Sequence, residues 1–266
     1  MPVKARARFV ELIKLGHIPL GVYLTSVDAA TTEVFAAAGY DFVIIDCEHG
    51  PHDNASALGH IRAAEAGGVI PLVRVLENSP TLIQASLDLG AHGVIVPKVE
   101  NAAHARTAVS ASLYAPKGFR GMCNGCHAAG YCGLDDWAEH QCQSDENVVI
   151  FPLIETVRGV ENIEEILDVP GIEFVFFGPG DLSNDMGVNL VREPEKLMPA
   201  WHKVKDAARA RGKYVVSVGA FGFEDADIYA GVMDLMMLRA TAAEAAKKHR
   251  AFVASRGESR QQAAMA

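Results

Sequence analysis

The chain has 266 residues, of which 50% are hydrophobic and 21% charged, a composition typical of folded globular proteins and too apolar for a disordered one. Acidic residues outnumber basic ones by 33 to 24, giving a formal net charge of −9, which argues against broad binding to nucleic acid or to an anionic membrane. No apolar run approaches the roughly 18 residues of a membrane span, and the stretch after MPVKARARF is too broken for a signal peptide. We therefore expect a cytoplasmic protein whose five cysteines are mostly reduced thiols.

Short β-branched and aromatic runs alternate with longer Ala-rich stretches along the chain. The expected strands are, in order, 21–25, 42–46, 69–75, 93–97, 148–155, 174–178, 214–218 and 232–238. Several of the helical stretches between them end in Gly, the usual C-terminal stop signal. Continuous apolar strands separated by helices indicate a parallel sheet covered on both faces, and eight such units close a (β/α)8 barrel. The rival, a doubly wound open sheet, is weakened because no G-x-G-x-x-G follows the first strand.

One long irregular segment, from about 115 to 147, interrupts this alternation. Loops of this length in compact domains are usually functional or disordered. No linker divides the chain, so we expect a single barrel domain over residues 1–255 that includes this segment. Residues 256–266 are expected to form a flexible C-terminal tail.

In a barrel of this kind, the active site lies at the C-terminal ends of the strands. The ionisable residues at the expected strand ends are Asp46, Glu48, His49, Arg74, Lys98, Glu100, Glu155 and Asp181. Glu155 and Asp181 could share one divalent cation such as Mg²⁺ or Mn²⁺, leaving positions for water and a chelating substrate. The small residues of GPG, 178–180, would let backbone N–H groups approach an anionic ligand closely.

The basic side chains complete a coherent set for acid–base chemistry. Arg74 could pair with a substrate carboxylate or stabilise an oxyanion through its planar fork. His49 could transfer protons near neutral pH, with Asp46 orienting its ring.

Structural roles compete with these assignments. Asp181 could simply cap a helix, whereas a buried Glu155 or Arg74 at the end of an apolar run needs a partner, which favours function. Because strand alternation turns at least one of Cys47 and Glu48 away from the pocket, we expect little from either residue.

The ordered motifs resemble those of the HpcH/HpaI aldolase family, the class II pyruvate aldolases, over about residues 20 to 240. The motifs are IIDCEHGPHD (44–53), PLVRV (71–75), GVIVPKVENAAHA (93–105), PLIET (152–156) and FFGPGDLSNDMG (176–187). The resemblance implies a (β/α)8 TIM barrel of the phosphoenolpyruvate/pyruvate-domain type. It also implies a metal-dependent aldolase, which makes or cleaves a carbon–carbon bond between the enolate of a pyruvate-like 2-oxo acid and an aldehyde.

The same resemblance assigns roles to individual residues. Glu155 and Asp181 would bind Mg²⁺, Mn²⁺ or Co²⁺, which the 2-oxo acid would chelate. Arg74 would stabilise the enolate, and His49, supported by Asp46, would act in proton transfer. These roles agree with the chemistry, since a cation and an arginine both stabilise a developing enolate.

The family also suggests how the substrate is held and how the chains assemble. Backbone groups around Gly178, Pro179 and Gly180 would hold the substrate carboxylate. Many relatives carry Trp in place of Tyr23 and Gln in place of Leu153; both positions line the pocket, so these departures concern substrate identity more than reaction class. Relatives commonly form oligomers, up to hexamers, from dimers that exchange a C-terminal helix.

Three alternatives stay open at this point. A class I mechanism could use Lys98, the one lysine placed at a strand end, as a Schiff base. Decarboxylation of oxaloacetate would need the same chelate and enolate but no acceptor base. A metal- or redox-sensing protein without catalytic activity could use the barrel as a scaffold.

The 115–147 segment departs most from the family, whose members have a small-residue loop there over the acceptor side of the site. It contains Cys123, Cys126, His127, Cys132, His140 and Cys142. C-x-x-C-H suggests haem attachment, which needs an export context, and the cysteine spacing could hold a structural zinc, although it lacks paired C-x-x-C motifs. A redox function and a Cys-rich pocket wall are the other interpretations.

Overall fold

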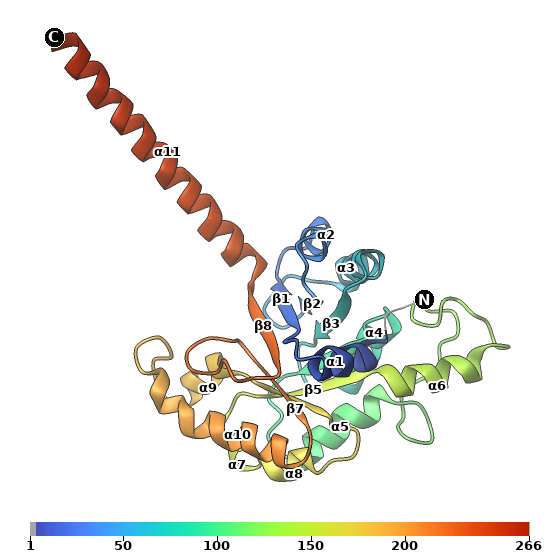
Figure 1. The fold of residues 1–266 in the computed structure, drawn as a ribbon. Coiled ribbons are helices and arrows are strands. Elements are labelled where there is room, and N and C mark those ends of the chain that lie inside the picture. The colour runs from blue at the N-terminus through green and yellow to red at the C-terminus, as the bar shows by residue number, and fades with distance from the viewer. Residues whose placement is uncertain (1–3, 266) are drawn as a thin grey trace.

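Eight parallel strands pair in sequence order and close into a barrel (Figure 1). The computed structural model describes the backbone of residues 4–265 and the side chains of residues 4–254 and 256. The strands are β1 (Leu20–Leu24), β2 (Phe42–Asp46), β3 (Ile70–Arg74), β4 (Gly93–Val96), β5 (Val149–Ile154), β6 (Phe174–Phe177), β7 (Tyr214–Ser217) and β8 (Ile228–Met233). The predicted (β/α)8 TIM barrel is confirmed.

Helices join the strands and cover the barrel. They are α1 (Ala5–Lys14), α2 (Ala30–Ala37), α3 (Asn54–Gly67), α4 (Pro80–Asp88), α5 (Ala102–Ser112), α6 (Trp137–Asn147), α7 (Val157–Glu161), α8 (Ile163–Leu167), α9 (Pro179–Asp185), η1 (Pro194–Leu197), α10 (Met198–Ala210) and α11 (Asp234–Met265). Local signals set both ends of α3: Asp53 and Ser56 form a capping box at its start, and Gly68, in the left-handed conformation, follows its last residue as the C-cap. No helix in residues 4–265 is long and apolar enough to cross a membrane.

The continuous apolar strands supply two separate cores. Along β2, Phe42 and Ile44 point into the barrel, whereas Val43 and Ile45 face the surrounding helices. This follows from the two-residue period of a strand, and it explains why a strand buried on both faces lacks polar alternation.

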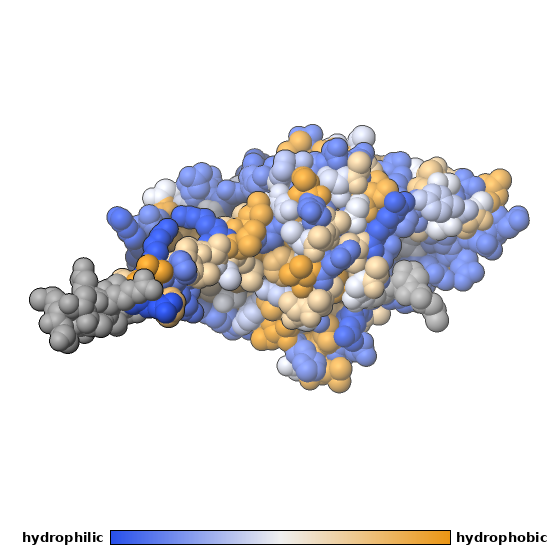
Figure 2. Space-filling model, turned by 90° about the horizontal axis from the view of Figure 1, so that it is seen from above, coloured by the Kyte–Doolittle hydropathy of each residue, from blue (hydrophilic) through white to orange (hydrophobic). Residues whose placement is uncertain are grey.

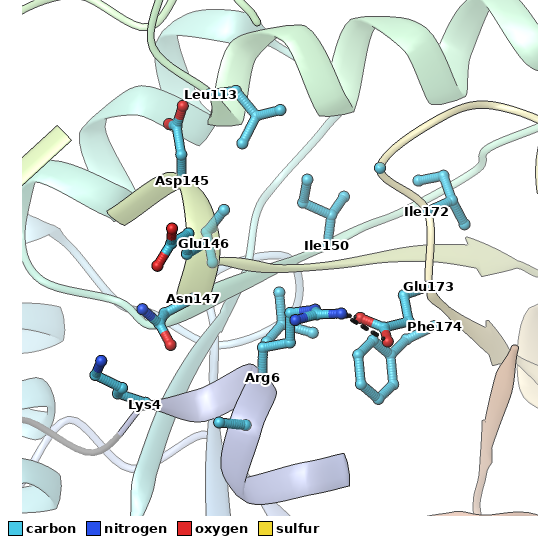
Figure 3. Close-up of a pocket in the computed structure, with 14 residues that line it drawn as sticks. Lys4, Arg6, Leu113, Asp145, Glu146, Asn147, Ile150, Ile172, Glu173 and Phe174 are labelled. Carbon is cyan, nitrogen blue, oxygen red and sulfur yellow. Dashed lines mark hydrogen bonds and ion pairs between the residues drawn. The ribbon is translucent and has the colours of Figure 1, made fainter. Parts of the chain in front are cut away.

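Helix α1 closes the N-terminal mouth of the barrel. Phe9 is fully buried, and its ring meets Phe42 and Phe151 edge-on, with centroids 5.3 Å and 6.1 Å apart. A polar cavity lies beside this helix, where Arg6 pairs with Glu173 (Figure 3). The C-terminal mouth is thus the end of the barrel left for chemistry.

Three boundaries differ from those predicted. The eighth strand lies at 228–233 rather than 232–238, because the apolar run DLMML begins helix α11 with Asp234 in its first turn. Residues 256–265, predicted as a flexible tail, continue this helix, since all but Gly257 and Ser259 are strong helix formers. The last third of the 115–147 segment is helix α6. The division into one domain over 1–255 stays a prediction.

Candidate functional site

The strand ends place a buried ion pair at the C-terminal mouth. Asp46 and Arg74 are opposite each other in the register of β2 and β3. Arg74 Nε donates to Asp46 Oδ1 at 2.8 Å and Nη2 donates to Oδ2 at 2.6 Å. The guanidinium also lies 4.8 Å from the ring centroid of Tyr23. Burial by itself would lower the pKa of Arg74, but the ion pair raises it above its ordinary value, so the arginine is a fixed cation.

Asp46 also holds the turn that follows β2. Its Oδ1 accepts the backbone N–H groups of Glu48 and His49, each at 3.2 Å. Gly50 closes the turn by donating to the Asp46 carbonyl, and a Cβ at this glycine would lie 2.4 Å from the same oxygen. His52 Nε2 lies 3.0 Å from a carbonyl at the end of β1. The ion pair and the turn are therefore one rigid unit.

Glu48 lies beside the His49 ring, whereas the sequence predicts Asp46 as the acid that orients it; the role of Asp46 toward the ring stays a prediction. Glu48 Oε2 lies 3.9 Å from His49 Nε2 and 3.3 Å from Arg74 Nη1. The Glu48 side chain is 5% exposed, and its buried Oε2 accepts no hydrogen bond among the described residues. In this arrangement both oxygens of Asp46 bond Arg74.

Glu48 differs from the expectation for a physical reason. Strand alternation holds only as far as Asp46, where β2 ends and a turn begins. In a turn the two-residue period no longer holds, so Glu48 could not be placed by counting from the strand. Only the doublet of an acid and a histidine after the strand pointed to it.

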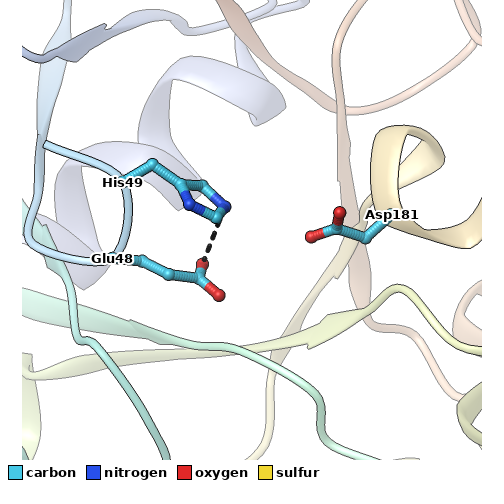
Figure 4. A group of neighbouring side chains, drawn as sticks. All are labelled: Glu48, His49 and Asp181. Carbon is cyan, nitrogen blue, oxygen red and sulfur yellow. Dashed lines mark ion pairs between the residues drawn. The ribbon is translucent and has the colours of Figure 1, made fainter. Parts of the chain in front are cut away.

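Carboxylate groups converge at this mouth. Ligand atoms of Glu48, His49 and Asp181 lie within 4.8 Å of one another, the one such group of three or more among the described residues (Figure 4). Glu155 is 3% exposed, and burial raises its pKa to about 7, with further raising by the charges of Glu48 and Asp181. Burial likewise raises the pKa of Glu48. Buried oxygen donors that repel one another suit a hard divalent cation.

Glu155 is oriented by its neighbours. Its Oε1 accepts the backbone N–H of Lys98 at 2.9 Å, which leaves Oε2 for a ligand. A Cβ at Gly178 would lie 2.9 Å from the Glu155 Cβ, so glycine is needed where β6 ends. These acids have the oxygen donors that a divalent cation needs, and the cation site at Glu155 and Asp181 stays a prediction, with Glu48 as an additional acid.

The GPG segment offers fewer donors than its sequence suggests. The Gly178 N–H already donates to the Ile154 carbonyl at 2.9 Å, and Pro179 has no N–H. Gly180 is exposed and lies in the first turn of α9, where N–H groups lack intrahelical partners. The N–H groups open to a ligand are therefore those of Gly180 and Asp181.

Tyr23 and Leu153 lie directly beneath this mouth, in the barrel interior. Burial raises the pKa of Tyr23 above its usual range, so its phenol stays protonated. The side chain of Leu153 lies 3.0 Å from a Cβ built on Gly178. Both residues are placed where they could shape the floor of the site, and their contact with substrate stays a prediction.

The Cys-rich segment lies apart from these strand ends. Arg120 pairs with Asp88 at the end of α4, and His127 pairs with Glu65 on α3. Cys126 packs against the buried cluster of Tyr114, Ala129 and Trp137. The structure does not bring three thiol or histidine ligands together within the described part of the chain. A zinc site at these cysteines stays an untested prediction.

Comparison with known proteins places this geometry in a family. The model of the HpcH/HpaI aldolase/citrate lyase family matches residues 20–236. The chain belongs to this family. It is 40% identical to a 2-dehydro-3,6-dideoxy-6-sulfogluconate aldolase of Pseudomonas putida over 66% of this chain and 68% of that one. It is 35% identical to a hydroxypyruvate/pyruvate aldolase of Agrobacterium fabrum over 77% and 78%.

Solved structures agree with this assignment. An HpcH/HpaI aldolase from Desulfitobacterium hafniense superposes with a TM-score of 0.82 at 28% identity, over 91% of this chain and 96% of that one. The chain is an aldolase of the HpcH/HpaI family on a (β/α)8 barrel.

Proposed function

We propose that this HpcH/HpaI aldolase is a class II enzyme, which uses a divalent cation to join the enolate of a pyruvate-like 2-oxo acid to an aldehyde or to cleave the product. The observation that supports this most is the convergence of acids at the C-terminal mouth, where Glu48 and Asp181 offer ligand atoms within 4.8 Å together with His49. The charges of the same two acids raise the pKa of the buried Glu155, and a cation would relieve this repulsion. A Schiff-base mechanism would not require these acids.

Glu155 and Asp181 would hold the cation, with the N–H groups of Gly180 and Asp181 toward the substrate carboxylate. When bound, Mg²⁺, Mn²⁺ or Co²⁺ supplies positive charge that stabilises the enolate of a 2-oxo acid. Arg74 presents Nη1, the end of the guanidinium not bonded to Asp46, toward the same space. A preorganised cation there stabilises charge where it develops.

The residue that would transfer the proton is His49, in the turn after β2. His49 has a side chain that is 53% exposed, so its Nε2 can meet an aldehyde oxygen that enters from solvent. In aldol addition the enolate carbon bonds to the aldehyde carbon, and the new alkoxide takes a proton from His49; cleavage reverses both events. Glu48, 3.9 Å from Nε2, would stabilise the protonated ring in place of Asp46.

A direct test follows the enolate without an acceptor. The chain is treated with EDTA, and exchange of the C3 protons of pyruvate with deuterium is measured by NMR before and after Mg²⁺, Mn²⁺ or Co²⁺ is restored. We expect exchange to stop and to return with the metal. Undiminished exchange in EDTA would exclude the class II mechanism, and trapping of pyruvate on Lys98 by borohydride would establish the class I alternative.

We further propose a homo-oligomer built from dimers. Helix α11 projects from the barrel rather than covering it (Figure 1), and exposed apolar side chains lie at its base: Val232, Leu235, Met236 and Leu238. In Figure 2 hydrophobic residues are interspersed with hydrophilic ones on the face seen from above. Replacing Leu235 and Leu238 by Asp should lower the mass measured by light scattering, and an unchanged mass would contradict this role for the helix.

A further inference from the structure

Lys98 has a backbone conformation that the site itself imposes. It follows β4 with φ of +52°, in the left-handed region that residues other than glycine seldom adopt. Its N–H donates to Glu155 Oε1 at 2.9 Å, and the next N–H, of Val99, donates to the Leu153 carbonyl at 3.3 Å. Such outliers persist where the surroundings fix them, and they cluster at functional sites. The clamp on Glu155 therefore also fixes where the Lys98 side chain begins, at the rim of the C-terminal mouth.

The Lys98 side chain differs from the other cation of this mouth. Arg74 is buried and bonds Asp46 along one edge. Lys98 is exposed, and within the described chain its ammonium makes no hydrogen bond or ion pair. Its charge nonetheless acts on Glu48, whose pKa is raised by burial and is lowered in part by Arg74, His49 and, to a smaller extent, Lys98. Its charge thus faces the site and remains available.

Other groups of the site would supply the positive charge near the enolate, so the Lys98 ammonium is not needed there. Asp46 balances Arg74, and a divalent cation would balance Glu155 and Asp181. Glu48 lies beside Arg74 and His49, at 3.3 Å and 3.9 Å. Arg74 and the divalent cation would therefore stabilise the enolate without a contribution from Lys98. The aldehyde enters from the solvent side, where His49 and Lys98 are both exposed. An uncharged acceptor gains nothing from an ammonium at that rim.

We propose that Lys98 is a specificity-determining residue that selects acceptor aldehydes carrying an anionic group, such as a carboxylate or a sulfonate, a few carbons from the carbonyl. The proposal rests on the aldolase function proposed above and names the class of acceptor. A lysine suits this role because a flexible point charge accepts anions of different shape and position, whereas a charge-assisted contact still discriminates strongly against a neutral chain.

The test compares two acceptors of equal length, succinic semialdehyde and butanal, with pyruvate as donor and the metal that supports exchange. The variants are Lys98→Met and Lys98→Arg, with Lys14→Met as a control that removes one exposed positive charge from the end of α1. We expect wild type to prefer the anionic acceptor. In Lys98→Met, kcat/KM for succinic semialdehyde should fall about 10- to 100-fold relative to that for butanal. Lys98→Arg should restore most of the preference, and Lys14→Met should keep all of it.

The outcomes separate this proposal from the reaction mechanism. Equal loss of both acceptors in Lys98→Met would overturn the proposal and favour a structural or Schiff-base role, and an unchanged ratio would overturn it as well. The proposal would also be overturned if the wild-type enzyme did not prefer succinic semialdehyde to butanal. Failure of wild type to exchange pyruvate protons with any metal would instead refute the proposed class II function. Circular dichroism of each variant checks that the barrel is folded.

Discussion

The two mouths of the barrel are built from the same strands in opposite ways. At the N-terminal mouth Phe9 of α1 fills the barrel against Phe42 of β2 and Phe151 of β5. At the C-terminal mouth the same two strands lead to Asp46 and Glu155. One end is closed by aromatic packing and the other is lined by buried charge.

The mouths also differ in how their charges are satisfied. At the N-terminal mouth Arg6 pairs with Glu173, and Asp145 accepts the Tyr114 N–H at 3.0 Å. At the C-terminal mouth Glu48 keeps a buried oxygen without a hydrogen bond, and Glu155 has its pKa raised to about 7 by burial. Unsatisfied buried charge opposes folding. The closed mouth therefore supplies stability, while the open mouth retains carboxylates that a bound cation would satisfy further.

The largest expected effect comes from Glu155→Gln at the open mouth. Gln keeps an oxygen to accept the Lys98 N–H but removes the negative charge, so aldol turnover and pyruvate proton exchange should both fall by about 10³-fold. Because the charge is costly to bury, the midpoint of thermal unfolding measured in EDTA should stay the same or rise. A variant that retains a tenth of the wild-type activity would show that the cation is held elsewhere.

At the closed mouth, Phe9→Ala should have the opposite signature. Removing a fully buried ring should lower the free energy of unfolding in urea by about 3–5 kcal/mol, while kcat per folded molecule changes little. Leu15→Ala at the exposed end of α1 is the matched control and should cost less than about 0.5 kcal/mol. A fall in kcat as large as that from Glu155→Gln would mean that the two mouths are coupled.

Much of this contrast can be predicted from the sequence. The strand runs ending at Asp46, Arg74 and Glu155 were placed within one residue, because β-branched runs between Gly-terminated helices leave little freedom. Because the active site of such a barrel lies at the C-terminal ends of its strands, the sequence also predicts that these residues lie near one another. The cross-strand partnership of Asp46 with Arg74 depends on register, which a strand assignment alone does not supply.

The remaining features depend on contacts that a linear pattern does not encode. The two-residue period of a strand does not predict the position of Glu48, which lies in a turn, and its burial beside Arg74 depends on tertiary contacts. The eighth strand differs from the prediction because the apolar residues at 234–238 begin an exposed helix. An apolar run therefore does not identify a strand when its side chains are not buried within the chain. The positive φ of Lys98 follows from a hydrogen bond to a strand neighbour and leaves no trace in composition.

A double-mutant cycle sharpens the account of the open mouth. If Glu48 supports the protonated His49, then Glu48→Gln and His49→Ala should each lower aldol kcat by about 10²-fold, and the double variant should lose little more than the larger single one. Losses that simply multiply would show that the two residues act independently. His49→Ala should also damage aldol turnover much more than decarboxylation of oxaloacetate, which needs no acceptor proton.

The smallest expected effect is a pH dependence of metal binding that only the open mouth should show. Burial raises the pKa of Glu155 from its ordinary 4.5 to about 7, so its contribution to the stability of the metal-free chain is complete below pH 4.5 and is lost as the pH rises through 7. A cation needs the deprotonated carboxylate, so each pH unit below 7 should weaken binding by up to about tenfold. The rise in thermal midpoint on adding Mn²⁺ should therefore grow between pH 5.5 and pH 8. Glu155→Gln should flatten that growth, whereas an equal rise at both pH values in wild type would mean that Glu155 is already ionised at the lower one.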